Sequence, residues 1–383
     1  MDLVIAHPFL HQMGGGEKVV LKLAEKFNPI IYSVVYEPKK TFPEFKEFDI
    51  RLLPKNINEN LFFFLKNDAR RHNAISAGFR YYSSKIKDEY DVINAHGSPS
   101  EWIANKNERV CWYVHSPNRE AYDLYKWRSL QLKWPKRVLN KGLVEIFKSV
   151  ESRIMPKIEK ICTNSEVTNE RIKKYLKRND AEVIHPGVEP KEFHCEEYEK
   201  YFLYPSRFVP EKRFEIAIDA FKQFNKQKKG WKLVLAGFLH DSKREQEYLV
   251  KLKRLAYGLP IEFILNPSDK KLSALYSRCY ATLFTAINED WGLVPLESMA
   301  SKKPCISMKE GGPCYSILNK KTGFLIEKEN EMTKKMIYLA DNPDKNEWLG
   351  KNGRERVLKN YTWKIFLKKM KKAFDETKNQ QGK

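Results

Sequence analysis

The feature that most constrains this chain is a repeated alternation of short apolar runs with segments of helical apolar spacing. Strands that alternate with helices form parallel sheets, because each helix returns the chain to the edge where the next strand begins. In the first half, strands are predicted at 3–6, 30–35, 91–95, 109–114, 160–163 and 181–185. In the second half, they are predicted at 201–205, 232–236, 261–265, 281–284, 305–308 and 324–326.

The segment from Pro186 to Pro190 interrupts this alternation, and an acidic stretch follows before the pattern resumes at Tyr201. Since a single core rarely grows beyond ~250–300 residues, the 383 residues are expected to form more than one domain. The predicted divisions are residues 1–190, residues 191–360 and a C-terminal segment at 361–383. The first two are expected to be doubly wound α/β domains that bind ligands at the carboxyl ends of their strands, in a shared cleft.

Several classes of protein are excluded. No apolar stretch approaches the ~20 residues of a membrane-spanning helix. Asp2 stands where a signal peptide carries its basic region, so a cytoplasmic protein is predicted. The six cysteines form no Cys-x-x-Cys pair, which favours reduced core thiols. Because the chain also lacks an Asp-x-Asp pair and a His/Cys cluster with ligand spacing, a required metal is not expected.

The formal net charge of +21 is concentrated in two segments. Residues 51–150 carry 18 Lys and Arg against 10 Asp and Glu, and residues 351–383 carry 11 against 3. The first segment interleaves bases with large apolar groups, and the last predicts a basic amphipathic helix. These surfaces suit an anionic membrane, although a solvated charged face over an aromatic core is an alternative, as is nucleic-acid binding. The interleaved runs lie at 61–66, 70–71, 79–82, 125–128 and 134–137.

Two carboxylates, Glu289 and Glu297, lie eight positions apart after the predicted strand at 281–284. Because proline favours the first turn of a helix, Pro295 places Glu289 in a loop and Glu297 in the first helical turn. Carboxylates at this edge of a sheet accept hydrogen bonds from hydroxyls, so the pair suits the two ends of a polyol. On spacing alone, a capped helix with ordinary surface acids is the alternative.

With Gly292 and Pro295 between them, Glu289 and Glu297 resemble the paired-glutamate motif of retaining glycosyltransferases of family 4. The resemblance implies the GT-B fold, with two Rossmann-like domains facing a central cleft and the C-terminal helix crossing back to the N-terminal domain. It also implies that the first domain binds the acceptor and the second binds a nucleotide sugar. Further segments agree in order and spacing across nearly the whole chain: 164–165, 171–175, 183–189, Phe193, 206–212, 311–312 and 322–325.

The resemblance assigns binding of the donor's diphosphate to Arg207 and Lys212. The planar guanidinium of Arg207 can bind two phosphate oxygens at once, and the ammonium of Lys212 acts as a point charge. The resemblance assigns sugar hydroxyls to Glu289 and the ribose to Glu297. An ordinary basic loop is the alternative for the two cations. The donor site is also expected to include Gly14, Gly15, Gly16, Trp291, Gly292, Leu293 and Val294.

The glycines at 14–16 follow the first strand and permit close approach of backbone N–H donors to a ligand. A flexible turn is the alternative, because Val19 stands where a dinucleotide fingerprint needs glycine. His115 closes the strand at 109–114 and opens a His-x-Pro-x-Arg run that ends at Arg119. This run resembles a family 4 subgroup that contains mannosyltransferases. The resemblance places His115 at the transferred sugar and Arg119 on the acceptor side, although a lone histidine here is usually structural.

The sequence therefore predicts a retaining, metal-independent hexosyltransferase with His115, Glu289, Arg207 and Lys212 as its catalytic residues. The donor is a nucleotide-diphosphate sugar, with GDP-mannose favoured, and the acceptor is a glycan or lipid-linked glycan at the cytoplasmic membrane face. No other cofactor and no nucleic acid is expected. A glycogen-type synthase and a nucleotide-sugar epimerase are alternatives. Lys302 stands where the family usually has glycine, so that turn is expected to be either rebuilt or strained.

Overall fold

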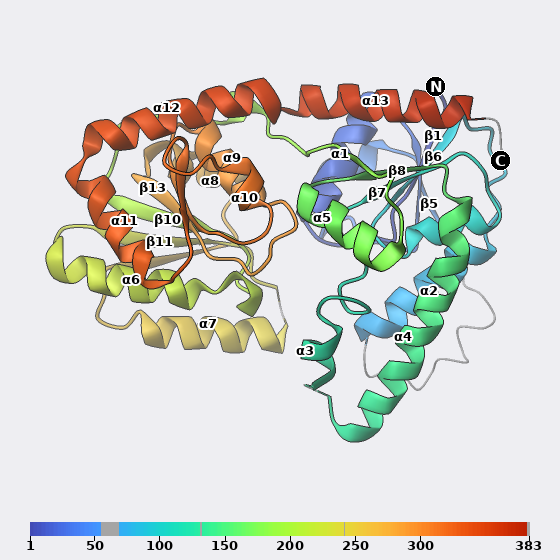
Figure 1. The fold of residues 1–383 in the computed structure, drawn as a ribbon, viewed down its shortest axis with the longest axis horizontal. Helices are drawn as coiled ribbons and strands as arrows, with labels where there is room; N and C mark the ends of the chain where they lie inside the picture. Colours follow the sequence, from blue (N-terminus) through green and yellow to red (C-terminus); the bar gives the residue numbers. More distant parts are fainter. Residues whose placement is uncertain (55–68, 131, 241, 381–383) are drawn as a thin grey trace. The chain divides into compact units, whose positions relative to one another are not determined.

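The computed structural model describes residues 1–54, 69–130, 132–240 and 242–380, apart from the side chains of 69–74 and 127. The chain forms two compact units. One contains Met1–His185 with Leu367–Lys383, and the other contains Pro186–Phe366. Each unit is an α/β domain with a parallel sheet at its centre (Figure 1).

The first unit contains a sheet with the strand order β5-β3-β1-β6-β7-β8-β9, in which all pairs are parallel. β1 and β6 are neighbours, and the chain winds outward from them in opposite directions. The loops after these two strands therefore diverge, which opens a crevice for ligands in doubly wound sheets. The strands are β1 (Leu3–Ala6), β3 (Ile30–Ser33), β5 (Ile50–Leu52), β6 (Val92–His96), β7 (Val110–Val114), β8 (Lys160–Thr163) and β9 (Glu182–Val183).

Helices pack against this sheet, and α1 does so through an apolar stripe. α1 buries Val19, Val20 and Leu23 at helical spacing. The C-terminal part of α13 lies beside α1, where the rings of Phe27 and Phe374 are 5.6 Å apart (Figure 1). The helices are α1 (Gly15–Phe27), α2 (Ala69–Ser83), α3 (Tyr125–Leu130), α4 (Trp134–Ile154), α5 (Glu166–Arg171) and α13 (Trp363–Asn379).

The second unit contains a parallel sheet with the order β12-β11-β10-β13-β14-β15, and its chain reverses direction between β10 and β13. Its strands are β10 (Tyr201–Pro205), β11 (Lys232–Gly237), β12 (Ile261–Leu265), β13 (Ala281–Phe284), β14 (Cys305–Met308) and β15 (Gly323–Ile326). Its helices are α6 (Phe214–Gln227), α7 (Lys243–Leu255), α8 (Asp269–Arg278), α9 (Leu293–Ala300), α10 (Pro313–Ser316), α11 (Asn330–Asp341) and α12 (Pro343–Asn360).

The predicted strands are all present, within a few residues at their ends. β5 was not predicted, because its three residues are only half-buried or exposed and form no apolar run. A separate parallel pair, β2 (Phe9–Leu10) and β4 (Val35–Tyr36), was also not predicted. Such short strands depend on their neighbours rather than on local sequence.

Some expectations about surface and core are wrong. Arg80 and Tyr81 are buried, so the run at 79–82 belongs largely to the core and not to a basic face. The guanidinium of Arg80 donates to the carbonyl oxygen of Leu53 (3.3 Å). Cys195 and Cys314 are only half-buried, whereas the other four cysteines are core residues, and all six are free. The run at 61–66 and the side chains of 70–71 lie outside the described residues.

The predicted amphipathic C-terminal helix is confirmed as α13. Its apolar side chains, including Met370 and Phe374, are buried, and Lys160 of β8 forms an ion pair with Glu376 (2.7 Å). Its lysines at 368, 369, 371 and 372 are exposed. The apolar face is therefore used inside the protein, and only the charges remain at the surface. No helix in the described ranges has the length and apolar character needed to cross a membrane.

Candidate active site

The loops after β10 and β13 adjoin at the carboxyl edge of the second sheet, at the reversal of strand order. Two buried side chains join them. The backbone N–H of Thr285 donates to the hydroxyl of Tyr204 (3.1 Å). The hydroxyl oxygen of Thr285 lies 2.9 Å from the carbonyl oxygen of Lys212. The fold thus holds the predicted phosphate-binding loop against the loop that carries Glu289.

Lys212 and Glu289 form an ion pair across these loops, with 2.6 Å between Nζ and Oε2. The ammonium also lies 5.6 Å from the centre of the Phe284 ring. Arg207 is exposed and forms no ion pair with any described residue. The structure therefore brings Lys212 and Glu289 together and leaves the Arg207 guanidinium accessible to an anion.

Glycines behind the glutamate loop fix the position of Glu289. The N–H of Gly312 donates to the carbonyl oxygen of Glu289 (2.8 Å). Gly311 has a positive φ of +64°, and a Cβ there would lie 2.3 Å from the same oxygen. Gly292 also has a positive φ, of +81°. Only glycine fits such close backbone contacts without strain.

The other residues of the glutamate motif have distinct environments. Trp291 is buried, and its Nε1 donates to the carbonyl oxygen of Pro186 (3.1 Å), so it packs beneath the loop. α9 begins at Leu293, two residues before the start that Pro295 predicts. Glu297 accepts a hydrogen bond from the hydroxyl of Tyr276 (2.6 Å). Leu293 and Val294 are half-buried at the start of the helix.

Two further residues, which contact this loop from neighbouring segments, were not predicted. Arg213 forms an ion pair with Glu310 (3.0 Å), and its Nε donates to the carbonyl oxygen of Thr285 (2.6 Å). Glu310 also accepts from the N–H of Asn288 (3.3 Å). These contacts hold the backbone of the glutamate loop at Thr285 and Asn288. The only sequence signals were the position of Arg213 beside Lys212 and of Glu310 beside Gly311.

In the first unit, three histidines gather at the carboxyl ends of β1, β6 and β7. His96 Nδ1 lies 3.2 Å from His115 Nε2, and His96 Nε2 lies 2.5 Å from Asn94 Oδ1. His7 Nδ1 lies 3.2 Å from the carbonyl oxygen of His96. Burial, together with the neighbouring His7, lowers the pKa of His115 to about 4. His115 is therefore a neutral imidazole near pH 7.

The glycine loop at 14–16 opens α1 beside these histidines. A Cβ on Gly16 would lie 3.8 Å from His115 Nε2, so the loop and the imidazole are in close contact. Glu17, in the first turn of α1, is buried and accepts from the side-chain amide of Gln12 (2.9 Å). Burial raises the pKa of Glu17, but the nearby His7 imidazole (3.9 Å) and the hydrogen bond from Gln12 outweigh burial and hold that pKa below its usual value. The helix N-terminus favours the same ionised form.

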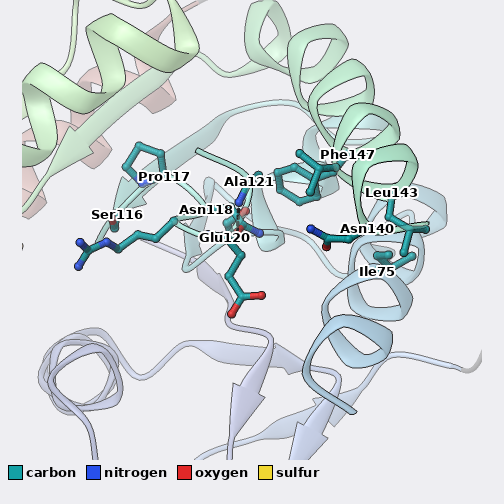
Figure 2. Close-up of a pocket in the computed structure, with 12 residues that line it drawn as sticks. Ile75, Ser116, Pro117, Asn118, Glu120, Ala121, Asn140, Leu143 and Phe147 are labelled. Carbon is teal, nitrogen blue, oxygen red and sulfur yellow. Dashed lines mark hydrogen bonds between the residues drawn. The ribbon is translucent and has the colours of Figure 1, made fainter. Parts of the chain in front are cut away.

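Arg119 and the loop after His115 line a pocket of about 300 Å³ within the first unit. Figure 2 shows Ser116, Pro117 and Asn118 on one side, and Asn140, Leu143 and Phe147 of α4 on the other. Arg119 forms an ion pair with Asp123 (2.9 Å). Asn164 donates to the carbonyl oxygen of His115 (2.8 Å), which anchors the start of this loop. The pocket therefore has a largely apolar wall from α4 and a polar rim.

Comparisons with known proteins show which family the chain belongs to. Residues 188–356 match the family described as "Glycosyl transferases group 1", and residues 13–192 match "Glycosyltransferase Family 4". The chain belongs to the family 4 glycosyltransferases. This glycosyltransferase is 24% identical to the alpha-1,3/1,6-mannosyltransferase ALG2 of Dictyostelium discoideum. The alignment spans 420 residues and covers 97% of each chain.

Solved structures support the fold of this family 4 glycosyltransferase. HepE of Anabaena in complex with UDP-glucose has a TM-score of 0.75 at 14% identity and covers 98% of this chain and 99% of its own. Sucrose-phosphate synthase of Thermosynechococcus elongatus has a TM-score of 0.76 at 18% identity, with the same coverage. The predicted GT-B class, with two Rossmann-like α/β domains, is confirmed.

Proposed function

We propose that this glycosyltransferase is a retaining enzyme that transfers mannose from a nucleotide-diphosphate sugar, with GDP-mannose as the favoured donor. The similarity to ALG2 over 97% of the chain supports mannose. The complex of HepE with UDP-glucose supports a nucleotide-sugar donor. The observation that carries the proposal is the Lys212–Glu289 ion pair where the second sheet reverses its strand order.

This ion pair suggests how a donor binds. A diphosphate competes with the Glu289 carboxylate for the Lys212 ammonium, while Arg207 supplies a second cation. When Lys212 turns to the diphosphate, Glu289 is released to accept hydrogen bonds from sugar hydroxyls. Glu297 receives the ribose. The two cations then stabilise the negative charge that grows on the diphosphate as the glycosidic bond breaks.

The acceptor side is assigned to the first unit. We propose that the pocket of about 300 Å³ beside Arg119 holds the acceptor and that His115 contacts the transferred sugar. The acceptor hydroxyl attacks the face that the diphosphate leaves, and the leaving diphosphate takes its proton. This route uses no protein nucleophile and no metal ion, because Lys212 and Arg207 provide the charge that a metal would supply.

A lipid-linked acceptor at a membrane surface is supported by an exposed stripe on α4. Trp134, Val138 and Ile146 are 75%, 59% and 51% exposed, and Gly142 continues their four-residue spacing. Arg137 and Lys141, both exposed, flank this stripe. Apolar and aromatic groups beside bases suit an anionic bilayer, whereas two copies of the same basic flank repel each other. We therefore propose peripheral membrane contact through α4, with the α13 lysines contributing charge alone.

The experiment is a transfer assay with several nucleotide sugars and with lipid-linked, glycan and glucan acceptors. We expect transfer from GDP-mannose, with the product keeping the donor's anomeric configuration in NMR spectra. Glu289→Ala and Arg207→Ala should each abolish transfer while the protein stays folded. An inverted product contradicts retention. Extension of a soluble glucan would indicate a glycogen-type synthase. Conversion of the donor sugar without any acceptor would indicate an epimerase. If the protein transfers no sugar but binds DNA in a salt-dependent way, a nucleic-acid-binding protein is indicated.

A further inference from the structure

The hydrogen bonds around His96 have a defined direction, and Asn94 sets it. The side-chain amide of Asn94 donates through Nδ2 to the carbonyl oxygen of Cys111 (2.8 Å). Its nitrogen is thereby committed, so its oxygen faces His96 Nε2 at 2.5 Å. An amide oxygen only accepts hydrogen bonds. His96 Nε2 must therefore carry the proton.

The same reasoning extends to His115. His96 is fully buried, and burial, with the nearby His115 and His7, lowers its pKa well below the usual value. A neutral imidazole that is protonated at Nε2 has only a lone pair at Nδ1. The 3.2 Å contact between His96 Nδ1 and His115 Nε2 therefore needs a proton on His115 Nε2. A neutral His115 then presents a lone pair at Nδ1.

The neighbouring groups leave this direction unchanged. His7 meets His96 at its backbone carbonyl oxygen, so it does not compete for either ring nitrogen of His96. His115 is half-buried, and no described residue forms a hydrogen bond to its Nδ1. Asn94 and His96 belong to β6, which adjoins β1 where the strand order of the first sheet reverses. The chain of hydrogen bonds thus ends at the edge where ligands bind.

We propose that Asn94 and His96 are positioning residues that hold His115 as the Nε2–H tautomer, so that His115 Nδ1 accepts a hydrogen bond from a substrate hydroxyl. This role rests on the proposed function, in which His115 contacts the transferred sugar. It assigns His115 as an acceptor towards a hydroxyl and excludes it as a donor to the leaving diphosphate. The tautomer is selected by a backbone carbonyl two side chains away.

The first test uses the full-length wild-type protein and does not depend on activity. Long-range ¹H–¹⁵N NMR spectra distinguish the two neutral tautomers of histidine, and the His115→Phe variant assigns the His115 signals. We expect His96 and His115 both as Nε2–H at pH 7. A His115 protonated at Nδ1 would overturn the proposal. The result is independent of whether the protein transfers sugar.

The second test compares Asn94→Leu with Asn107→Leu. Asn107 is a matched control, because it is also a buried amide with two kinds of bond. It accepts a hydrogen bond from the backbone N–H of Ile86 (2.9 Å) and donates one to the carbonyl oxygen of Ser84 (2.9 Å). Asn107 lies before β7, outside the strand that carries His96. Both substitutions remove a buried amide, but only Asn94→Leu removes the acceptor of His96.

We expect Asn94→Leu to populate both His115 tautomers and to lower kcat by roughly tenfold or more, with little change in the KM for the nucleotide sugar. Asn107→Leu should lower stability and leave the tautomer and kcat unchanged. A single Nε2–H tautomer or an unchanged kcat in Asn94→Leu overturns the proposal. If Asn94→Leu does not fold, the wild-type spectrum still decides the tautomer. Absence of transfer by the wild-type protein would contradict the proposed function instead.

Discussion

Lys212 Nζ and Glu289 Oε2 lie 2.6 Å apart, joining the loops that follow the neighbouring strands β10 and β13. Both side chains are partly shielded from water, so their attraction exceeds that of an exposed pair. The Lys212 ammonium is thus neutralised by the Glu289 carboxylate. In the proposed donor site, a diphosphate has to displace this carboxylate to bind the ammonium.

This exchange predicts opposite effects of Glu289→Gln on binding and on turnover. Free nucleoside diphosphate should bind more tightly, because Lys212 no longer has a competing carboxylate. Transfer should fall by ~10²-fold or more, since Gln accepts sugar hydroxyls poorly. Calorimetry and initial rates measure the two quantities. The control is Glu327→Gln, which breaks the exposed Lys309–Glu327 pair (2.6 Å) of the same unit and should change neither. Weaker diphosphate binding by Glu289→Gln would contradict the exchange.

Replacing Glu151 of α4 is expected to stabilise the protein in a pH-dependent way. Glu151 is buried and accepts from the Tyr122 hydroxyl, and burial raises its pKa to about 7. A carboxyl whose folded pKa is raised contributes its stability below the unfolded pKa and loses it as the pH rises through the folded value. Glu151→Gln should therefore raise the free energy of unfolding at pH 8 by on the order of 1–3 kcal/mol and change it little at pH 5.

Urea unfolding at both pH values measures this effect. Glu145→Gln is the matched control on the same helix, because Glu145 is exposed and pairs with Lys148 (3.3 Å). It should change stability little at either pH. Equal effects of Glu151→Gln at pH 5 and pH 8 would show that this carboxyl does not titrate as described.

Lys302 predicts a stabilising substitution. Its φ is +54°, in the left-handed region that costs a side chain about 1–2 kcal/mol. Lys302→Gly should raise the free energy of unfolding by up to ~1 kcal/mol, because relief of strain exceeds the added entropy of the unfolded chain. Lys328→Gly, at an exposed position without positive φ, should lower it by a similar amount. Thermal unfolding compares the stability of the two variants. If Lys302→Gly lowers the free energy of unfolding, the backbone at Lys302 is not strained.

The stripe on α4 predicts how the enzyme reaches a bilayer. The double variant Trp134→Ser with Val138→Ser should lose binding to anionic vesicles in co-sedimentation, because it removes the groups that enter the interface. Transfer to a soluble acceptor should stay unchanged. The control pair is Val250→Ser with Tyr257→Ser, which removes side chains that are 49% and 92% exposed in the second unit. Full vesicle binding by the α4 variant would exclude this surface.

Neutralising the α13 lysines at 368, 369, 371 and 372 separates charge from insertion. Their helix has already buried its apolar face, so they contribute only electrostatic attraction. Vesicle binding by this variant should weaken mainly at low salt. Loss of binding at all salt concentrations would instead make α13 the principal contact.

Much of the fold was predictable, because the apolar periodicity of strands and helices is a local property. The strands at 160–163, 201–205 and 281–284 have the predicted bounds. The paired glutamates were found for a related reason, since Gly292 and Pro295 mark a strand-to-helix loop. The burial of Arg80 was missed, because its run of aromatic and basic residues fits a surface and a core equally well.

The sequence by itself determined where strands, helices and the glutamate loop lie, because side-chain size and spacing decide these locally. Only the tertiary structure decided that Lys212 meets Glu289, that Arg213 braces Thr285, and that Asn94 directs His96 towards His115. The contacts of Lys212 with Glu289 and of Arg213 with Thr285 depend on β10 lying beside β13. The contact of His96 with His115 depends on β6 lying beside β7. Strand order is set by packing over the whole domain, so residues far apart in the sequence become partners only when the sheet has formed.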